Sequence, residues 1–273
     1  MENAATVRIE DLETVLVWEG ELDNQGIREL LGVKAVWASR LLGALGKAMG
    51  RRAKRETPYA PLKVASRAVS QGRHRSPDEY LRVLAGSKDT RRRRAVEDAR
   101  MDLAAASPMV FSAVFRAISA GTGLSMVYRS MSSPEGTTRL VFPHALVRAP
   151  RRWHMRAWCS QRQDFRDFTL GRVASVQVVD EVAPRSRKDD EEWNAQLELE
   201  LVAHPALSME QQDMIAGEYF AGAESLRLKV RQCLAAYIIQ DLRLSTDERR
   251  HVPPEYQLLV NNTETLPPLF NGP

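Results

Sequence analysis

The feature that most constrains the fold is a change in hydrophobic periodicity along the chain. From residue 8 to about 105, apolar residues recur at helical spacing. From about 109 to 183, one helix is followed by short segments in which apolar and polar residues alternate, as they do in strands. A single chain with both patterns in separate stretches predicts an α+β protein of several domains, with helices first and a sheet behind them.

The remainder of the chain reads as a charged connection followed by a smaller α/β region. Residues 184–192 are polar and charged, which predicts a solvated linker. Residues 196–202 alternate like a strand, Ser208 with Gln211 predicts a capped helix start, and residues 231–242 predict a second helix. We therefore expect domains at 1–107, 108–184 and 190–273, with an irregular proline-containing tail.

Composition narrows the class of protein without naming it. The 273 residues carry 44% hydrophobic and 27% charged side chains, which excludes wholesale disorder. The formal net charge is only +4, so the positions where basic residues cluster indicate a partner better than the total charge does. Two cysteines are too few for a disulfide framework, and no signal peptide or membrane-spanning run is visible. We expect a cytoplasmic protein without membrane association.

The first region has the order of elements found in a helix-turn-helix. The helix that begins near Ile9 ends at Gly20, a short helix starts near Asn24, and Gly32 permits a tight turn before a third helix, 34–49. On that third helix we expect Trp37, Leu41, Leu45 and Met49 to face the core, because they recur every four residues.

This assignment leaves small and cationic residues facing outward, as a helix that reads a DNA groove requires. Segments 51–57 and 59–65 are expected to form a wing whose cations contact phosphates. The predicted DNA-binding residues are Lys34, Ala35, Ala38, Ser39, Arg40, Lys47, Arg51, Arg52, Lys54 and Arg55. The alternative is a three-helix bundle with a solvated basic face. The run Arg91 to Arg94 is expected to lie on a solvated linker helix and is assigned no site.

The second region offers a candidate ligand site. Alternation places Arg152, His154 and Arg156 on one face of a strand. Convergence with side chains from neighbouring strands would suit a phosphate or a nucleic-acid segment, with aromatic rings for stacking. The predicted ligand-binding residues are Tyr128, Ser130, His144, Arg152, His154, Arg156 and Arg166. The alternative is that the arginines are exposed strand residues paired with Asp164 or Asp167.

Several motifs together resemble a known family. Residues 142–147 (Phe-Pro-His-Ala-Leu-Val), 152–159 (Arg-Trp-His-Met-Arg-Ala-Trp-Cys) and 165–173 (Phe-Arg-Asp-Phe-Thr-Leu-Gly-Arg-Val) are similar to the WYL domain of the BrxR/CapW regulators of anti-phage defence operons. The name-giving triplet reads Trp153-His-Met in this chain. Residues 18–20 and 38–40 resemble the winged helix-turn-helix of these regulators, and residues 204–208 and 230–237 resemble their C-terminal WCX domain.

The resemblance implies a function as well as a fold. It implies an Sm/SH3-like WYL barrel that senses nucleic acid or a nucleotide, and an α/β WCX domain that dimerises. The homodimer would repress a BREX- or CBASS-type operon by binding an inverted repeat in double-stranded operator DNA. No cofactor or metal is expected, because no P-loop, nucleophile elbow or paired metal-ligand motif is present. The competing classes are a nucleic-acid-processing enzyme without a recognisable motif and a nucleotide-sensing adaptor that does not bind DNA.

Overall fold

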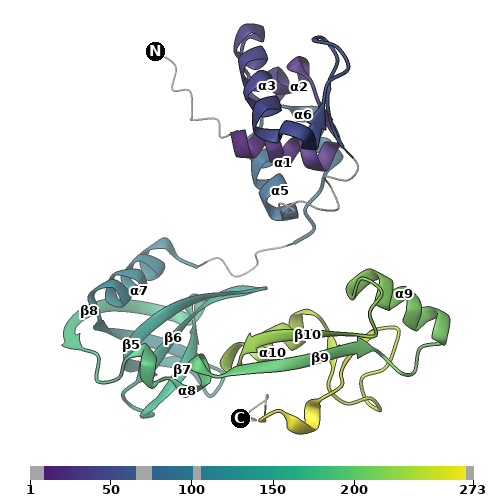
Figure 1. The fold of residues 1–273 in the computed structure, drawn as a ribbon. Helices are drawn as coiled ribbons and strands as arrows, with labels where there is room; N and C mark the ends of the chain where they lie inside the picture. The colour runs from purple at the N-terminus through teal and green to yellow at the C-terminus, as the bar shows by residue number, and fades with distance from the viewer. Residues whose placement is uncertain (1–8, 66–75, 101–105, 269–273) are drawn as a thin grey trace. The chain divides into compact units, whose positions relative to one another are not determined.

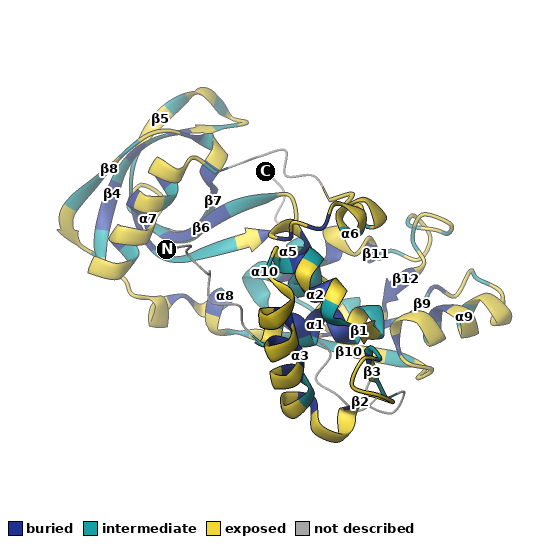
Figure 2. Cartoon of the chain, turned by 90° about the horizontal axis from the view of Figure 1, so that it is seen from above, coloured by how far each residue is buried: buried dark blue, intermediate teal, exposed yellow. Residues whose placement is uncertain are grey.

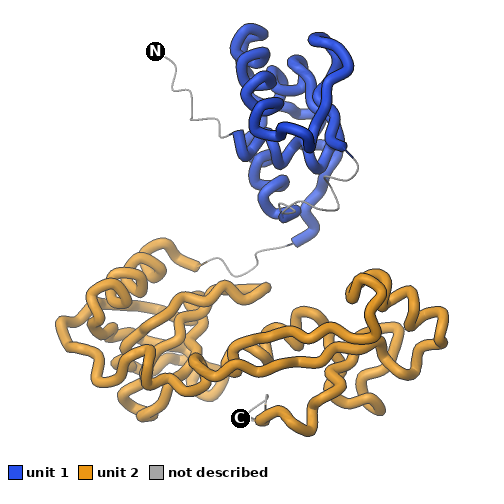
Figure 3. Tube along the Cα trace, in the orientation of Figure 1, with its two compact units in different colours: residues 1–100 blue, residues 101–273 orange. Residues whose placement is uncertain are grey.

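The computed structural model describes residues 9–65, 76–100 and 106–268. It divides into two compact units, residues 1–100 and residues 101–273, each described here by itself (Figures 1 and 3). Helices and strands are both present in each unit, and two strands of unit 1 fall within the segments 51–57 and 59–65 expected to form a wing. Among the described residues, no helix combines the length and the apolar character needed to cross a membrane.

Unit 1 is built on three helices and a small antiparallel sheet. Helices α1 (Ile9–Glu19), α2 (Asn24–Leu31) and α3 (Ala35–Met49) alternate with strands β1 (Glu21–Leu22), β2 (Ala53–Lys54) and β3 (Leu62–Val64). The strands pair in the order β1-β3-β2. Helices α5 (Pro77–Ala85) and α6 (Thr90–Ala95) complete the unit, and the 3-10 turn η1 (Gly50–Arg52) joins α3 to β2.

The turn between α2 and α3 sets the direction of α3. Asp23, one residue before the predicted cap, accepts a hydrogen bond from Gly26 N and begins α2. Gly32 ends the helix in the left-handed region at φ 66°, where a side chain would be strained. The atoms nearest to a Cβ at Gly32 belong to the flexible end of Lys88, so backbone conformation is what favours glycine here.

The burial of α3 corrects the predicted face of this helix. Ala38 is fully buried, whereas Trp37 is 45% exposed. The buried stripe runs through Ala38, Leu41, Leu42, Leu45 and Met49. A strict four-residue repeat drifts around a helix of 3.6 residues per turn, so the first member of the expected series falls off the core face. Ala38 therefore packs inside, and Trp37 takes its place on the surface.

In the Arg91 to Arg94 run, Arg91, Arg93 and Arg94 are exposed on α6, as expected, whereas Arg92 is not. Arg92 donates to Glu19 Oε1 from Nε at 2.8 Å and to Asp89 Oδ2 from Nη1 at 2.5 Å. Its side chain is 12% exposed, and Asp89 caps α6. Arg92 thus ties α6 to the end of α1, a contact between segments far apart in sequence.

Unit 2 begins with a helix laid on a five-stranded antiparallel sheet. Helix α7 (Pro108–Ala120) precedes β4 (Thr122–Ser130), β5 (Ser133–Ala149), β6 (Arg152–Cys159), β7 (Asp164–Thr169) and β8 (Val173–Val182). Their order is β7-β6-β5-β4-β8. Buried residues of α7 share a core with residues of β4, β5 and β6, among them Met126, Val141 and Met155.

The expected barrel is an open sheet in the described residues. The first half of β5 pairs with β4 and the second half with β6, so this long strand spans both halves of the sheet. The edge strands β7 and β8 do not pair with each other in the described part of the chain. The 3-10 turn η2 (Leu170–Arg172) joins the two edge strands in sequence. Without pairing between β7 and β8, the sheet of the described residues does not close into a barrel.

The rest of unit 2 is a four-stranded mixed sheet with helices. Turn η3 (Arg187–Asp189) and helix α8 (Glu191–Asn194) lead into β9 (Gln196–Ala203), α9 (Met209–Tyr219), β10 (Ser225–Arg231) and α10 (Gln232–Asp241). Strands β11 (Leu244–Ser245) and β12 (Leu258–Val260) and turn η4 (Thr263–Thr265) follow, with strand order β10-β9-β12-β11. The predicted capping box at Ser208 and Gln211 is confirmed.

Candidate functional site

The outward face of α3 is the first candidate site. Lys34, Ala35, Ser39 and Arg40 are exposed, as the sequence predicts, together with Val36, which is 70% exposed. Figure 2 shows this helix with exposed residues along one side and buried residues along the other. Of the predicted residues on the first half of α3, all but Ala38 are exposed, and Ala38 is buried.

A hydrogen-bond pair holds the start of α3 against α2. Asn24 Nδ2 donates to the carbonyl of Ala35 at 2.9 Å and to Ser39 Oγ at 2.7 Å. Ser39 thus accepts from a side chain of the preceding helix, and its own hydroxyl proton can be donated to another acceptor. Asn24, which the sequence suggested only as a helix cap, positions this face instead.

The cations around α3 differ in how far they are already engaged. In the described part of the chain, no ion pair involves Lys34, Arg40, Lys47, Arg51 or Lys54, and all five are exposed. Arg52, by contrast, pairs with Glu13 at 2.7 Å. Arg55 donates to the carbonyls of Pro58 and Ala60 in the turn between β2 and β3, so it shapes that turn. The charges of the first five are therefore not neutralised by a carboxylate of the described chain.

The second candidate site lies on β6 of unit 2. His154 and Arg156 lie on the same face of this strand, as the alternation predicts, and Met155 and Ala157 point into the core. Of the other predicted ligand residues, Tyr128 and Ser130 do not join them. Tyr128 is on the core face, where its hydroxyl accepts from Thr169 N at 3.2 Å. Ser130 is at the far end of β4 and contacts Ser132.

Arg166 is separated from Arg156 by strand register. Arg156 pairs with Asp167 across β6 and β7, and Arg166 pairs with Ala157. Since residues opposite each other share a face and neighbours alternate, Arg166 lies on the face opposite to Arg156. It is 55% exposed and pairs with Asp164 at 3.2 Å, which is the alternative that the sequence left open for it.

Arg156 is the centre of a buried carboxylate network. It donates to Asp190 Oδ2 from Nε at 2.8 Å and to Asp190 Oδ1 from Nη2 at 2.9 Å. It also donates to Glu192 Oε2 at 2.8 Å and lies 3.6 Å from Asp167 Oδ1. His144 Nε2 approaches Asp190 Oδ2 at 2.8 Å. The guanidinium is thus saturated by the chain's own carboxylates.

This network corrects the expectation that residues 184–192 form a solvated linker. Asp190 is 1% exposed and accepts from Trp193 N as the N-cap of α8. Burial disfavours its charged form, yet the hydrogen bonds from Arg156 and His144 hold the pKa of Asp190 well below its usual range. Four consecutive acidic residues gave no signal that one of them is buried.

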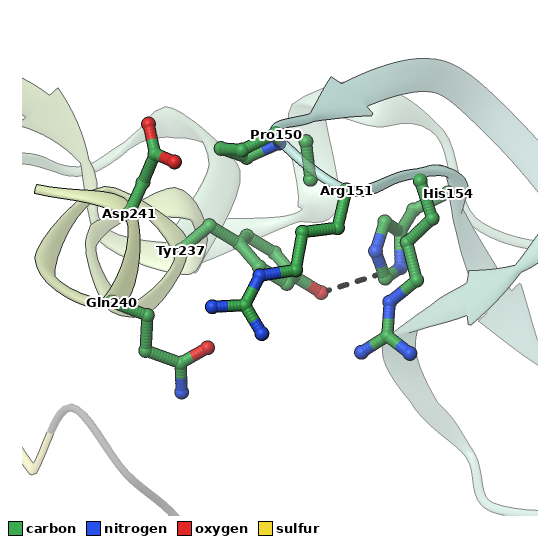
Figure 4. Close-up of a pocket in the computed structure, with 8 residues that line it drawn as sticks. Pro150, Arg151, His154, Tyr237, Gln240 and Asp241 are labelled. Atoms are coloured by element: carbon green, nitrogen blue, oxygen red, sulfur yellow. Dashed lines mark hydrogen bonds between the residues drawn. The ribbon is translucent and has the colours of Figure 1, made fainter. Parts of the chain in front are cut away.

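A cavity of about 270 Å³ lies beside this network, between β6 and α10 (Figure 4). Arg151, Arg152 and His154 line it from the sheet, and Tyr237, Gln240 and Asp241 line it from α10. The Tyr237 hydroxyl donates to Asp167 Oδ2 at 3.0 Å and lies 3.5 Å from His154 Nδ1. The sequence missed the α10 residues, because nothing in a helical pattern shows which strand it will cover.

His154 is electrically neutral near pH 7. Burial, together with the charges of Arg152 and Arg172, lowers the pKa of His154 to about 4. Its Nε2 is buried without a hydrogen-bond partner among the described residues. The cationic side of the cavity is therefore supplied by the arginines. Within the described ranges, no group of three or more histidine, cysteine and acidic residues is arranged to hold a metal ion.

Two stretches of unit 2 match the models of known protein families. Residues 109–178 match the model of the WYL domain, and residues 196–266 match the model described as "BrxR transcriptional regulator, C-terminal dimerization domain". The resemblance expected from the sequence is confirmed for these two stretches. Arg156 and His154 lie in the first, Tyr237 lies in the second, and Asp190 lies in the stretch between them.

Three curated relatives carry the same description, "DNA-binding transcriptional repressor CapW". The protein from Escherichia coli (strain KTE188) is 34% identical over 157 residues, which are 58% of this chain and 52% of the relative. Those from Pseudomonas aeruginosa and Stenotrophomonas maltophilia are 30% and 33% identical, over 59% and 56% of this chain and 54% and 51% of each relative. The chain spans about half the length of the curated relatives it matches.

One solved structure, proteasome accessory factor B/C (PafBC) of Arthrobacter aurescens, is 18% identical and covers 66% of this chain and 32% of that chain. Its TM-score of 0.30 establishes no shared fold.

Proposed function

We propose that this chain, which carries a WYL domain followed by a BrxR-type C-terminal domain, is a sequence-specific DNA-binding transcriptional repressor. The observation that carries the proposal is the outward face of α3, which combines exposed small and polar residues with cations that no carboxylate of the described chain neutralises. Unit 1 is then a winged helix-turn-helix, with α3 in the major groove and the turn between β2 and β3 as the wing. The names of the curated relatives support the same reading.

The test is binding to the DNA upstream of the protein's own gene, measured by footprinting and by mobility shift. Arg40→Ala should weaken binding about tenfold, and affinity should fall steeply as salt rises, because cations on phosphates displace counterions. Arg94→Ala is a matched control from the same unit, since this exposed arginine lies on α6, outside the α3 face and the proposed wing. Equal affinity of wild type for the upstream fragment and for random duplex at physiological salt would remove the repressor assignment.

We propose a homodimer as the acting species. The matched C-terminal model is described as a dimerization domain, and an inverted repeat would seat two recognition helices one helical turn apart or a multiple of it. At the end of α10, Ile238 packs against the C-terminal core, whereas Leu242 is 47% exposed and can meet a partner. Leu242→Glu should shift the mass measured by light scattering toward the monomer, and an unchanged dimer mass contradicts this use of the surface.

We propose that the cavity between β6 and α10 takes the effector, a nucleotide or a short nucleic acid, whose binding relieves repression of a BREX- or CBASS-type operon. The support is chemical: Arg151 and Arg152 can meet phosphate, and Tyr237 can meet a base. A short single-stranded oligonucleotide should release wild type from its operator. Arg152→Ala should bind operator normally and resist release, and release identical to wild type argues against this cavity.

The regulator is favoured over the two other classes by separate observations. The relatives named as repressors speak against a nucleic-acid-processing enzyme, and the free cations on α3 speak against an adaptor without DNA binding. Incubating operator DNA with the protein and Mg²⁺ or Mn²⁺ distinguishes the enzyme, since a regulator retards the fragment without cutting it.

A further inference from the structure

The centre of the exposed face of α3 is a stripe that includes an apolar residue and a glycine. Val36, Arg40, Gly43 and Lys47 follow one another at spacings of four, three and four residues, so they lie on one line along the helix. All four are exposed, and they lie opposite the buried stripe that contains Ala38, Leu41 and Leu45.

Val36 is not explained by the packing of unit 1. It is 70% exposed and stands one turn from the exposed Arg40. An exposed valine is ordinary on many surfaces, but here it shares its stripe with two cations, Arg40 and Lys47, that attract a polyanion. The surface is therefore complementary in charge to a duplex at the point where the apolar side chain projects.

Gly43 is a second, independent observation on the same stripe. A Cβ added at Gly43 would have no atom within 4 Å, so the fold does not require glycine there. Glycine in the middle of a helix is unfavourable compared with alanine. Gly43 thus weakens the helix and relieves no crowding inside the protein. The close approach of a binding partner to the helix backbone would account for it.

Resting on the proposed DNA-binding function, we propose that the Val36–Gly43 stripe lies against the floor of the major groove and that Val36 recognises the 5-methyl group of a thymine in each half-site. The thymine methyl is the only apolar group that a base pair presents in the major groove, and apolar side chains read it by contact. Gly43 lets the helix backbone come close enough for that contact. This names a class of operator: one with a thymine at a fixed position in both halves of the inverted repeat.

The experiment replaces thymines of the footprinted operator by uracil, one position at a time, which removes only the methyl group. Wild type should lose about threefold to tenfold in affinity at one position per half-site, as expected for one buried methyl group. Val36→Ala should lose a similar factor on the unmodified operator and show no further loss with uracil at that position. The control Val182→Ala removes the same atoms from a valine that is 79% exposed in unit 2, and it should keep the full uracil effect.

Gly43→Ala provides a variant whose folding is not in question. It should raise the melting temperature of unit 1 by roughly 4 °C, because alanine favours the helix. It should nevertheless weaken operator binding about tenfold through the added methyl group at the contact.

The proposal is overturned if no thymine responds to uracil, if Val36→Ala retains the wild-type response, or if Gly43→Ala binds with unchanged affinity. A wild type that fails to bind unmodified operator is a different result, since it removes the proposed function itself.

Discussion

Arg40 on α3 and Arg156 on β6 were both predicted from sequence to bind an anion, yet the structure gives them opposite surroundings. Arg40 is exposed and has no ion pair among the described residues. Arg156 is 4% exposed and is surrounded by Asp167, Asp190 and Glu192. A cationic residue indicates a binding site only when the fold leaves its charge unneutralised.

The largest effect is expected from Arg156→Ala. Removing the guanidinium leaves Asp190 buried without its cation, which should lower the free energy of unfolding of unit 2 by about 3–5 kcal/mol. Denaturant unfolding followed by tryptophan fluorescence measures it, since Trp193 adjoins the network in α8. A variant as stable as wild type would show that the network contributes only specificity.

The next effect is a dependence of stability on pH. Because the pKa of His154 is lowered to about 4 in the folded protein, the unfolded chain binds the extra proton between about pH 6.5 and pH 4. The contribution of His154 to stability is therefore fully present above pH 6.5, and about 3 kcal/mol of it is lost as the pH drops to about 4.

Denaturant midpoints at several pH values follow this loss. His154→Gln should remove most of the slope, whereas His251→Gln, in the same unit but outside the network, should retain it. An equal slope in both variants assigns the pH dependence to other groups.

A smaller and opposite pattern is expected at Arg40. Arg40→Ala should change the free energy of unfolding by no more than about 0.5 kcal/mol, because an exposed residue without a partner contributes little to folding. Binding to operator should still weaken by about 1.4 kcal/mol, the equivalent of tenfold. The Arg40 variant then loses operator binding and keeps its stability, whereas the Arg156 variant loses stability. A substantial loss of stability in Arg40→Ala would contradict this difference.

The smallest effect is expected at Arg166, whose partner Asp164 is also exposed. Surface ion pairs of this kind contribute about 0–1 kcal/mol, so Arg166→Ala should leave both unfolding and operator binding close to wild type. A fall in stability approaching that of Arg156→Ala would show that the register argument misplaces this side chain.

Patterns within one element could be read from the sequence with good accuracy. The helix expected at 34–49 is Ala35–Met49, the strand expected at 196–202 is Gln196–Ala203, and the cap at Ser208 is present. These features depend on neighbours in sequence. The same is true of the shared face of His154 and Arg156, because alternation is a property of a single strand.

The errors arose where the outcome depends on contacts between distant segments. Trp37 was placed inside by a four-residue repeat, and only the packing of α1 and α3 shows that Ala38 is the buried residue. The faces of Tyr128 and Arg166 depend on strand pairing, which local alternation does not fix. Asp190 resembled its acidic neighbours until the fold brought it to Arg156, 34 residues away.

The pairing of Arg156 with Asp190 has a consequence for the exchange of parts between relatives. The matched WYL stretch ends at residue 178 and the BrxR-type stretch begins at residue 196, yet the carboxylate that neutralises a WYL arginine belongs to neither. A chimera joined at residue 178, where the WYL match ends, would combine Arg156 from one parent with the connecting segment that holds Asp190 from the other. Recombination, in nature or in the laboratory, therefore has to carry the connecting segment with the sheet, and the unit of inheritance extends beyond the recognisable domain.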